Sequence, residues 1–116
     1  MAKECEEALR EIVEGFRSCR RAFTAIGDET RQLILLVLLQ SDLTGVRVGE
    51  IAEKAHLTRP SVSHHLQILR EAGIVAMRRE GTRNFYYLSV DGTQWKEIAG
   101  LIDLIYASIL HISAPT

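Results

Sequence analysis

Residues 57–88 read LTRPSVSHHLQILREAGIVAMRREGTRNFYYL, and this stretch decides the fold that we predict. Its first half carries Val62, Leu66 and Leu69 at positions i, i+4 and i+7, which places three apolar side chains on one side of a helix. The opposite side of that helix is polar. A helix with this pattern packs one face on a core and leaves the other face free to contact a partner.

Local signals bound this helix and predict a hairpin after it. Thr58 suits an N-cap, Pro60 falls in the first turn, where its missing N–H costs little, and Gly73 suits a left-handed residue after the last turn. Apolar residues then recur about every second position on both sides of residues 80–83, where Gly81 supplies the turn. A helix followed by such a hairpin is the order of elements in a winged helix-turn-helix.

The polar side of the helix and the arginines of the hairpin are candidate contacts to DNA. Serine and glutamine hydrogen-bond several base edges, and an arginine fork fits guanine or a phosphate. The residues that we predict to contact DNA are Arg59, Ser61, Ser63, His64, Gln67, Arg78, Arg79 and Arg83. The alternative is that these side chains only solvate an outer face. His65 lies nearer the apolar side, so we expect a packed, hydrogen-bonded histidine there.

This stretch resembles the recognition helix and wing of the arsenical-resistance-regulator (ArsR) family. The runs that carry the resemblance are Ser61–Leu66, Leu69, Ala72–Val75 and Arg78–Gly81, with Gly27–Arg31 upstream. The resemblance implies a small homodimeric transcriptional regulator, in most cases a repressor, that a metal or another signal releases from double-stranded DNA. It also implies a dimer made by the first and last helices.

The composition fits one small helical domain, which we take as residues 1–116. Hydrophobic residues make up 47% of the chain and aromatic residues 6%, which suits a core of leucine, isoleucine, valine and alanine. The net charge is −1, but residues 56–90 hold five arginines against two glutamates, a local charge of +3. Because affinity for phosphates depends on local cationic density, this asymmetry favours a nucleic-acid partner.

Several classes of function are not expected. No apolar run approaches the ~18 residues of a membrane helix, and the N-terminus MAKECEEALRE is too charged for a secretion signal, so we expect a cytoplasmic protein with no membrane partner. Neither a glycine-rich phosphate loop nor a Ser/His/Asp set outside the helix-turn-helix is present, so we expect no enzyme. The competing function is a winged-helix protein-interaction module without DNA affinity.

The whole fold is predicted to be mainly α, with about five helices and a two-stranded wing. Helices outside the opening stretch are predicted at residues 2–24, 48–55 and 93–112, with a further one from Asp28 or Glu29. That further helix contains the unbroken apolar run 33–39, which we expect to be covered on every side. Gly15 should weaken the first helix by roughly 1 kcal/mol relative to alanine. We expect residues 48–89, the helix-turn-helix and the wing, to be the part of the domain that binds DNA.

The last predicted helix carries a wide apolar band that no downstream element can bury. We therefore expect residues 2–24 and 93–112 to form the interface of a two-fold homodimer, which would bind an inverted repeat. The alternative is a monomer whose terminal helices cover each other.

The zinc sites of the resembled family are not matched. One site of the family has Cys-Val-Cys-Asp-Leu where this chain has Arg47–Ile51, so the two thiols are absent. A second site uses an Asp-x-His and a His-x-x-His or His-x-x-Glu pair on the last helix, where this chain has only Asp103 and His111. We expect no metal cofactor at either site.

Cys5 and Cys19 are the remaining candidates for sensing a signal. Fourteen residues of helix rise about 21 Å, so the two thiols cannot meet within one straight helix. Antiparallel first helices of a dimer would bring Cys5 of one chain near Cys19 of the other, as a thiol pair for arsenite, a soft metal or oxidation. The alternative is one buried and one exposed structural thiol. An apolar effector at the subunit interface also stays open.

Overall fold

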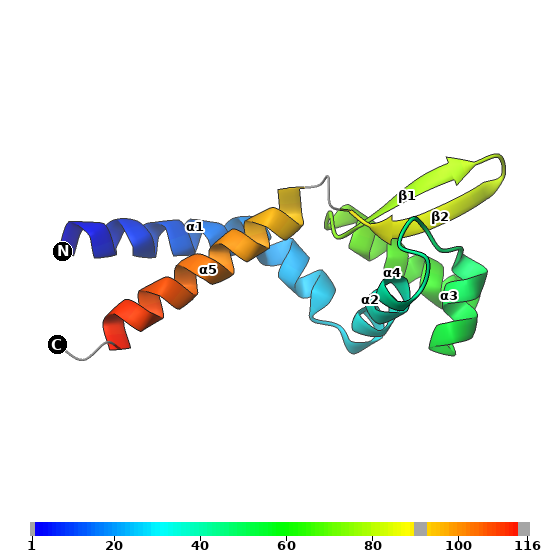
Figure 1. Ribbon diagram of the computed structural model, residues 1–116, viewed down its shortest axis with the longest axis horizontal. Helices are drawn as coiled ribbons and strands as arrows, with labels where there is room; N and C mark the ends of the chain where they lie inside the picture. The colour runs from blue at the N-terminus through cyan, green and yellow to red at the C-terminus, as the bar shows by residue number, and fades with distance from the viewer. Residues whose placement is uncertain (1, 90–92, 114–116) are drawn as a thin grey trace.

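The chain consists of a head and two long terminal helices, α1 (Ala2–Ile26) and α5 (Thr93–Ser113), which lie side by side and extend away from the head (Figure 1). The computed structural model describes residues 2–89 and 93–113. The head contains α2 (Glu29–Gln40), α3 (Val48–Ala55), α4 (Arg59–Glu71), β1 (Val75–Glu80) and β2 (Arg83–Leu88). These elements form the predicted winged helix-turn-helix with one antiparallel hairpin.

Capping groups visible in the sequence explain where the helices of the head begin and end. Oγ1 of Thr58 accepts a hydrogen bond from the backbone N–H of Ser61 at 3.3 Å, which starts α4. Oδ2 of Asp28 accepts one from the backbone N–H of Arg31 at 2.9 Å, which starts α2. Gly73 follows α4 with a φ of +77°, the predicted left-handed conformation. The predicted bounds of α3 are confirmed.

The hairpin has the predicted turn and one neighbour that was not predicted. Glu80 of β1 lies opposite Arg83 of β2, and Gly81 occupies the turn with a φ of +63°. Val46 forms an isolated bridge to Tyr86, in which the backbone N–H of each residue donates to the carbonyl oxygen of the other at 2.8 Å. This bridge attaches the loop between α2 and α3 to β2.

The core of the head lies where α2, α3 and α4 meet the start of the hairpin. Its largest fully buried side chains are Ile34, Leu38, Ile51, Leu66, Leu69 and Ile74. The expectation that the run 33–39 is covered on every side is wrong, because Leu33, Leu36 and Leu39 are 39%, 51% and 53% exposed. Over most of their length the terminal helices extend away from the head (Figure 1), and the end of α1 contributes the buried side chains of Ala22 and Ala25 to its core.

The two terminal helices touch at Gly15 of α1. A Cβ atom there would lie 2.6 Å from Cδ1 of Leu101, which is buried. The glycine that weakens the helix locally therefore gives Leu101 room against α1. Both helices run slightly beyond their predicted ends, α1 to Ile26 and α5 to Ser113.

Contact between α1 and α5 leaves much of their apolar surface uncovered. The exposed large hydrophobic residues on the two helices are Leu9, Val13, Phe16, Ile102, Tyr106, Ile109, Leu110 and Ile112. The monomer alternative required the terminal helices of one chain to cover each other's apolar surface. They do so only in part.

Candidate nucleic-acid interface

α4 separates its apolar and polar side chains as its spacing predicted. Val62, Leu66 and Leu69 are completely buried against the core. The exposed side chains on the other face include Ser63, His64 and Gln67. Burial of one face fixes the rotation of the helix about its axis, so these three polar residues are held outward on a rigid support.

α3 supports α4 through the predicted turn at residues 56–57. His56 has a φ of +56°, in the left-handed region, and the backbone N–H of Leu57 donates to the carbonyl oxygen of Ala52 at 3.0 Å. The outward side of α3 carries Glu50, whose carboxylate lies 2.9 Å from Nζ of Lys54. This ion pair leaves α3 without free positive charge toward a phosphate, as expected for a supporting helix.

Arg59 opens α4 and is exposed. Its guanidinium lies over the first turn of α3, where a Cβ atom on Gly49 would be 2.8 Å from Nη2 of Arg59. Gly49 thus leaves room for the arginine, a role that no sequence pattern indicated. Ser61, two residues on, is half-buried, and its backbone N–H is bonded to the Thr58 side chain.

Arg78 differs from Arg79 because its guanidinium bonds to a loop outside the hairpin. Its Cζ lies 4.8 Å from the centroid of the Phe85 ring, over the ring face. Its guanidinium donates to the carbonyl oxygen of Thr44 and, at 3.3 Å, to the carboxylate of Glu80. Arg78 therefore joins the middle of β1 to the loop before α3, a structural role that the sequence analysis missed.

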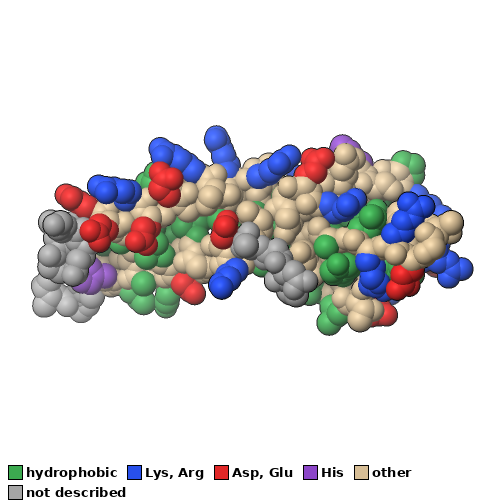
Figure 2. Space-filling view, turned by 90° about the horizontal axis from the view of Figure 1, so that it is seen from above, with side chains coloured by type: hydrophobic (Ala, Val, Ile, Leu, Met, Phe, Trp, Pro, Cys, Tyr) green, Lys and Arg blue, Asp and Glu red, His purple; other side chains and the backbone are tan. Residues whose placement is uncertain are grey.

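Arg79 and Arg83 are exposed near the hairpin turn. Nε of Arg79 donates to the carbonyl oxygen of Gly81 at 3.0 Å, which leaves the rest of its guanidinium fork available. Figure 2 shows Lys and Arg side chains gathered at the end of the molecule where the hairpin lies. The hairpin tip therefore offers positive charge on the head that also carries the polar face of α4.

Two polar residues of α4 contact other side chains, Gln67 one within α4 itself and His65 one in α2. Nε2 of Gln67 donates to Oε1 of Glu71 at 3.3 Å, and Oε2 of Glu71 lies 3.4 Å from Nη2 of Arg21 in α1. Nδ1 of His65 lies 3.3 Å from Nη1 of Arg31, and the ring is half-buried. The prediction of a packed, hydrogen-bonded histidine at position 65 is confirmed.

Known proteins share this arrangement. The family model described as "Bacterial regulatory protein, arsR family" matches residues 28–76, from the cap of α2 into the hairpin. An HTH-type transcriptional regulator from Methanocaldococcus jannaschii is 41% identical over 91 residues, which cover 78% of this chain and 98% of that protein. The chain belongs to the ArsR family. It is therefore a transcriptional regulator with a DNA-binding fold and not an enzyme, as predicted.

A repressor and a solved structure are also similar to this chain. The transcriptional repressor SdpR from Bacillus subtilis is 42% identical over 71 residues, 61% of this chain and 73% of that protein. The homodimeric winged helix-turn-helix DNA-binding domain of a possible ArsR-family regulator from Mycobacterium bovis is 24% identical, with a TM-score of 0.60 and 87% of each chain covered. The second comparison confirms the fold class.

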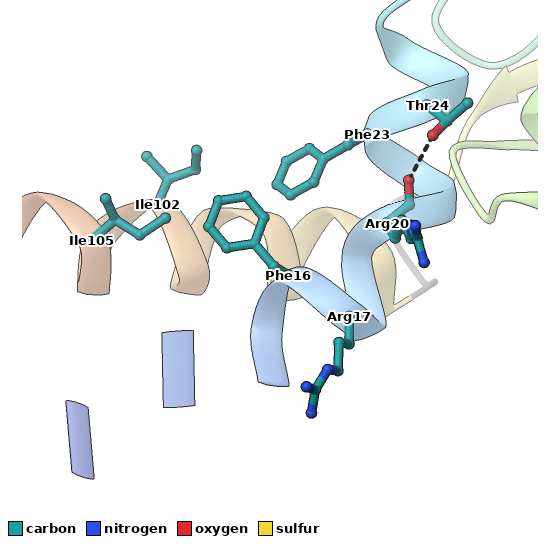
Figure 3. Close-up of a pocket in the computed structure, with 7 residues that line it drawn as sticks. All are labelled: Phe16, Arg17, Arg20, Phe23, Thr24, Ile102 and Ile105. Carbon is teal, nitrogen blue, oxygen red and sulfur yellow. Dashed lines mark hydrogen bonds between the residues drawn. The ribbon is translucent and has the colours of Figure 1, made fainter. Parts of the chain in front are cut away.

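An apolar groove runs between α1 and α5 of this ArsR-family chain (Figure 3). Phe16 and Phe23 of α1, whose ring centroids are 5.7 Å apart, point toward Ile102 and Ile105 of α5. Arg17 points away from the two rings and pairs with a glutamate of its own helix at 3.0 Å. The groove therefore presents hydrocarbon to whatever lies in it.

The two cysteines of this ArsR-family chain differ in exposure. Cys5 is exposed, whereas Cys19 is buried, with 1% of its surface accessible. A partner's Cys5 could reach that thiol only if the side chains covering Cys19 moved away. The burial favours two structural thiols over the thiol pair considered above. Within residues 2–89 and 93–113, no three His, Cys, Asp or Glu side chains converge to hold a metal ion.

Of the helices described, none combines the length and the apolar character that crossing a bilayer requires.

Proposed function

We propose that this ArsR-family regulator is a homodimeric repressor that binds an inverted-repeat operator in a promoter and is released by a signal. The observation that carries the proposal is the exposed polar face of α4, on the same head as two exposed arginines at the hairpin tip. Hydrogen-bonding side chains on a helix read base edges in a major groove, and guanidinium groups neutralise phosphates. We place the regulator in the cytoplasm with its DNA.

The proposed contacts divide by chemistry. We assign groove contacts to Arg59, Ser61, Ser63, His64 and Gln67, and phosphate or minor-groove contacts to Arg79 and Arg83. Arg78 supports these contacts by fixing the middle of the hairpin to the loop before α3. Ser61 contributes through its hydroxyl, since its backbone N–H is already bonded within the helix start.

A second copy of the chain is the proposed occupant of the groove between α1 and α5. The groove and the exposed apolar side chains on both helices form a surface that a monomer leaves in water. The M. bovis domain with the same fold is homodimeric, which supports this occupant. A two-fold axis through the helices would present two α4 helices to half-sites about one helical turn (~34 Å) apart.

The proposed release mechanism acts on the geometry of this dimer. An effector that binds one arrangement of the two subunits better than the other shifts the population toward it. If one α4 helix no longer fits its half-site in the favoured arrangement, the dimer dissociates from the operator. A small molecule at the subunit interface would act in this way.

Two measurements test the proposal. Sedimentation equilibrium should give a dimer, and selection from a random duplex library should enrich an inverted repeat. Binding to the selected duplex should weaken as salt rises, because each neutralised phosphate contributes about 0.9 to the logarithmic slope. A monomer, or a dimer that binds no duplex at low salt, would support the protein-interaction module instead.

A further inference from the structure

Arg31, in the first turn of α2, holds a guanidinium group in an unusually enclosed place. Its side chain is only 12% exposed. Nε donates to the carbonyl oxygen of Ala25 at 2.7 Å, and Nη2 to that of Thr24 at 3.3 Å. Nη1 faces Nδ1 of His65 at 3.3 Å and lies 4.0 Å from Oδ2 of Asp28. Arg31 thus contacts α1, the start of α2 and α4.

The first of these contacts completes the end of α1. The last four carbonyl groups of a helix lack partners within it and carry partial negative charge. The backbone N–H of Gly27 takes the carbonyl of Phe23, Arg31 takes the next two carbonyls, and Nε2 of Gln32 takes that of Ile26 at 2.9 Å. The end of α1 is therefore fastened to the first turn of α2.

The second contact reaches the recognition helix. A guanidinium group has donors and no acceptor, so Nδ1 of His65 must accept this hydrogen bond. The ring of His65 lies 5.5 Å, between centroids, from the ring of His64, which is exposed on the reading face. Arg31 thus contacts His65, which directly follows His64, a residue that we propose to contact DNA.

A separate link between the same helices is more exposed. Arg21 of α1 lies 3.4 Å from Glu71 of α4, with 73% and 51% of the two side chains accessible. Exposed ion pairs of this kind contribute little, since water and salt screen them. The enclosed link through Arg31 is therefore better suited than the exposed ion pair to fix the position of α4 relative to α1.

We propose that Arg31 is a positioning residue for DNA recognition, which fixes the recognition helix α4 relative to the dimer helix α1 through His65. The proposal rests on the proposed function, in which α1 and α5 form the dimer. Each head would still recognise a half-site without this link. The two heads would lose their fixed spacing, so the gain in affinity from the second half-site would fall.

The test compares a full operator, selected as described above, with a duplex that carries one half-site. Fluorescence anisotropy would measure wild type, Arg31→Lys, His65→Leu and His65→Asn. Lysine keeps the charge without the planar fork, leucine removes the acceptor, and asparagine restores an oxygen near the position of Nδ1. Arg21→Ala, which removes the exposed link between α1 and α4, is the matched control.

Arg31→Lys and His65→Leu should lose at least about tenfold in affinity for the full operator and less than about threefold for the half-site. His65→Asn and Arg21→Ala should stay near wild type on both duplexes. Circular dichroism and sedimentation would establish that each variant is a folded dimer. If Arg31→Lys unfolds, His65→Leu carries the test, since the end of α1 keeps its cap.

Equal losses on the two duplexes, or unchanged binding to both by folded His65→Leu dimers, would overturn the role of Arg31. Failure of the proposed function looks different. In that case wild-type protein itself shows no preference for a full operator over a half-site.

Discussion

Leu101 of α5 packs so closely on Gly15 of α1 that a Cβ atom at position 15 would lie 2.6 Å from Cδ1 of the leucine. Leu101 is 5% exposed, while its neighbours Ile102 and Tyr106 are 52% and 64% exposed. The close approach thus coincides with the best-covered side chain of α5. Gly15 lowers the intrinsic stability of α1, but it lets α5 pack closely against α1 at this point. Elsewhere the two helices expose much of their apolar surface.

Gly15→Ala should therefore lower the thermal unfolding midpoint. Alanine is favoured over glycine in a helix interior by about 1 kcal/mol, so a glycine-to-alanine change would raise stability if the new Cβ met no neighbour. Here the new methyl group must displace Leu101, and overpacking typically costs about 1–3 kcal/mol. Thermal unfolding followed by circular dichroism measures the difference.

Gly100→Ala is the matched control on α5. No neighbouring group in the described part of the chain comes within 4 Å of a Cβ at position 100. This change should raise the midpoint, since only helix propensity acts. The double variant Gly15→Ala/Leu101→Ala should be less destabilised than the sum of its single changes. A stabilising Gly15→Ala would show that the two helices do not pack as described.

Leu38 and Leu36 of α2 should respond very differently to truncation. Leu38 is 2% exposed and lies in the core, so Leu38→Ala should cost about 2–5 kcal/mol of unfolding free energy. Leu36 is 51% exposed, so Leu36→Ala should cost less than about 1 kcal/mol. Urea unfolding measures both values, and similar losses would mean that a partner subunit covers this side of α2.

The recognition helix and the hairpin could be predicted because their determinants are local. Thr58 caps a helix whose apolar residues repeat every three or four positions, and Gly73 and Gly81 adopt positive φ where the chain must turn. These signals act within a few residues, so a single sequence displays them. The rotation of α4, and with it the exposed polar face, follows from the same spacing.

Other features depend on residues far apart in the chain and could not be predicted. The bridge between Val46 and Tyr86 needs the hairpin to fold back beside the loop before α3. The polar partners of Arg78 include Thr44 from that loop, so an arginine that looks like a phosphate contact is engaged in structure. The apolar run 33–39 is a similar case. Its composition indicates that these side chains tend to be buried, but it does not indicate which neighbouring element buries them.

Asp28 should make stability depend on pH in the acidic range. The hydrogen bond from the backbone N–H of Arg31 is the main cause that holds the pKa of Asp28 below its ordinary 3.8, and the Arg31 guanidinium and His65 add to it. Because the folded pKa is the lower one, the ionised cap stabilises the fold above about pH 3.8. That contribution disappears as the pH falls through the folded pKa.

Asp28→Asn tests this dependence, since asparagine keeps a capping oxygen and does not titrate. Wild type should be more stable than the variant at pH 7, and the difference should shrink as the pH falls below 4. Urea unfolding across this range measures it. A difference that is the same at every pH would contradict the role of the ionised carboxylate.

Cys5 and Cys19 should differ in reactivity toward iodoacetamide. Cys5 is exposed and should be alkylated in the folded protein at close to its rate in urea, whereas Cys19 is 1% exposed and should react only on opening. Mass spectrometry of peptides after timed labelling separates the two sites. Native mass spectrometry with arsenite should show no adduct. A stoichiometric adduct that Cys5→Ser and Cys19→Ser each abolish would establish the thiol pair instead.

The proposed DNA contacts should divide into two kinds of behaviour. Arg59→Ala and His64→Ala remove groove contacts, so each should weaken binding to the selected operator by about 1–3 kcal/mol and change the preferred sequence. Arg79→Ala removes positive charge at the hairpin tip, so it should weaken all duplexes alike and reduce the salt slope by about 1. Arg10→Ala, at an exposed position of α1 away from the head, should change neither. A loss confined to one sequence in Arg79→Ala would move that residue from the phosphates to the bases.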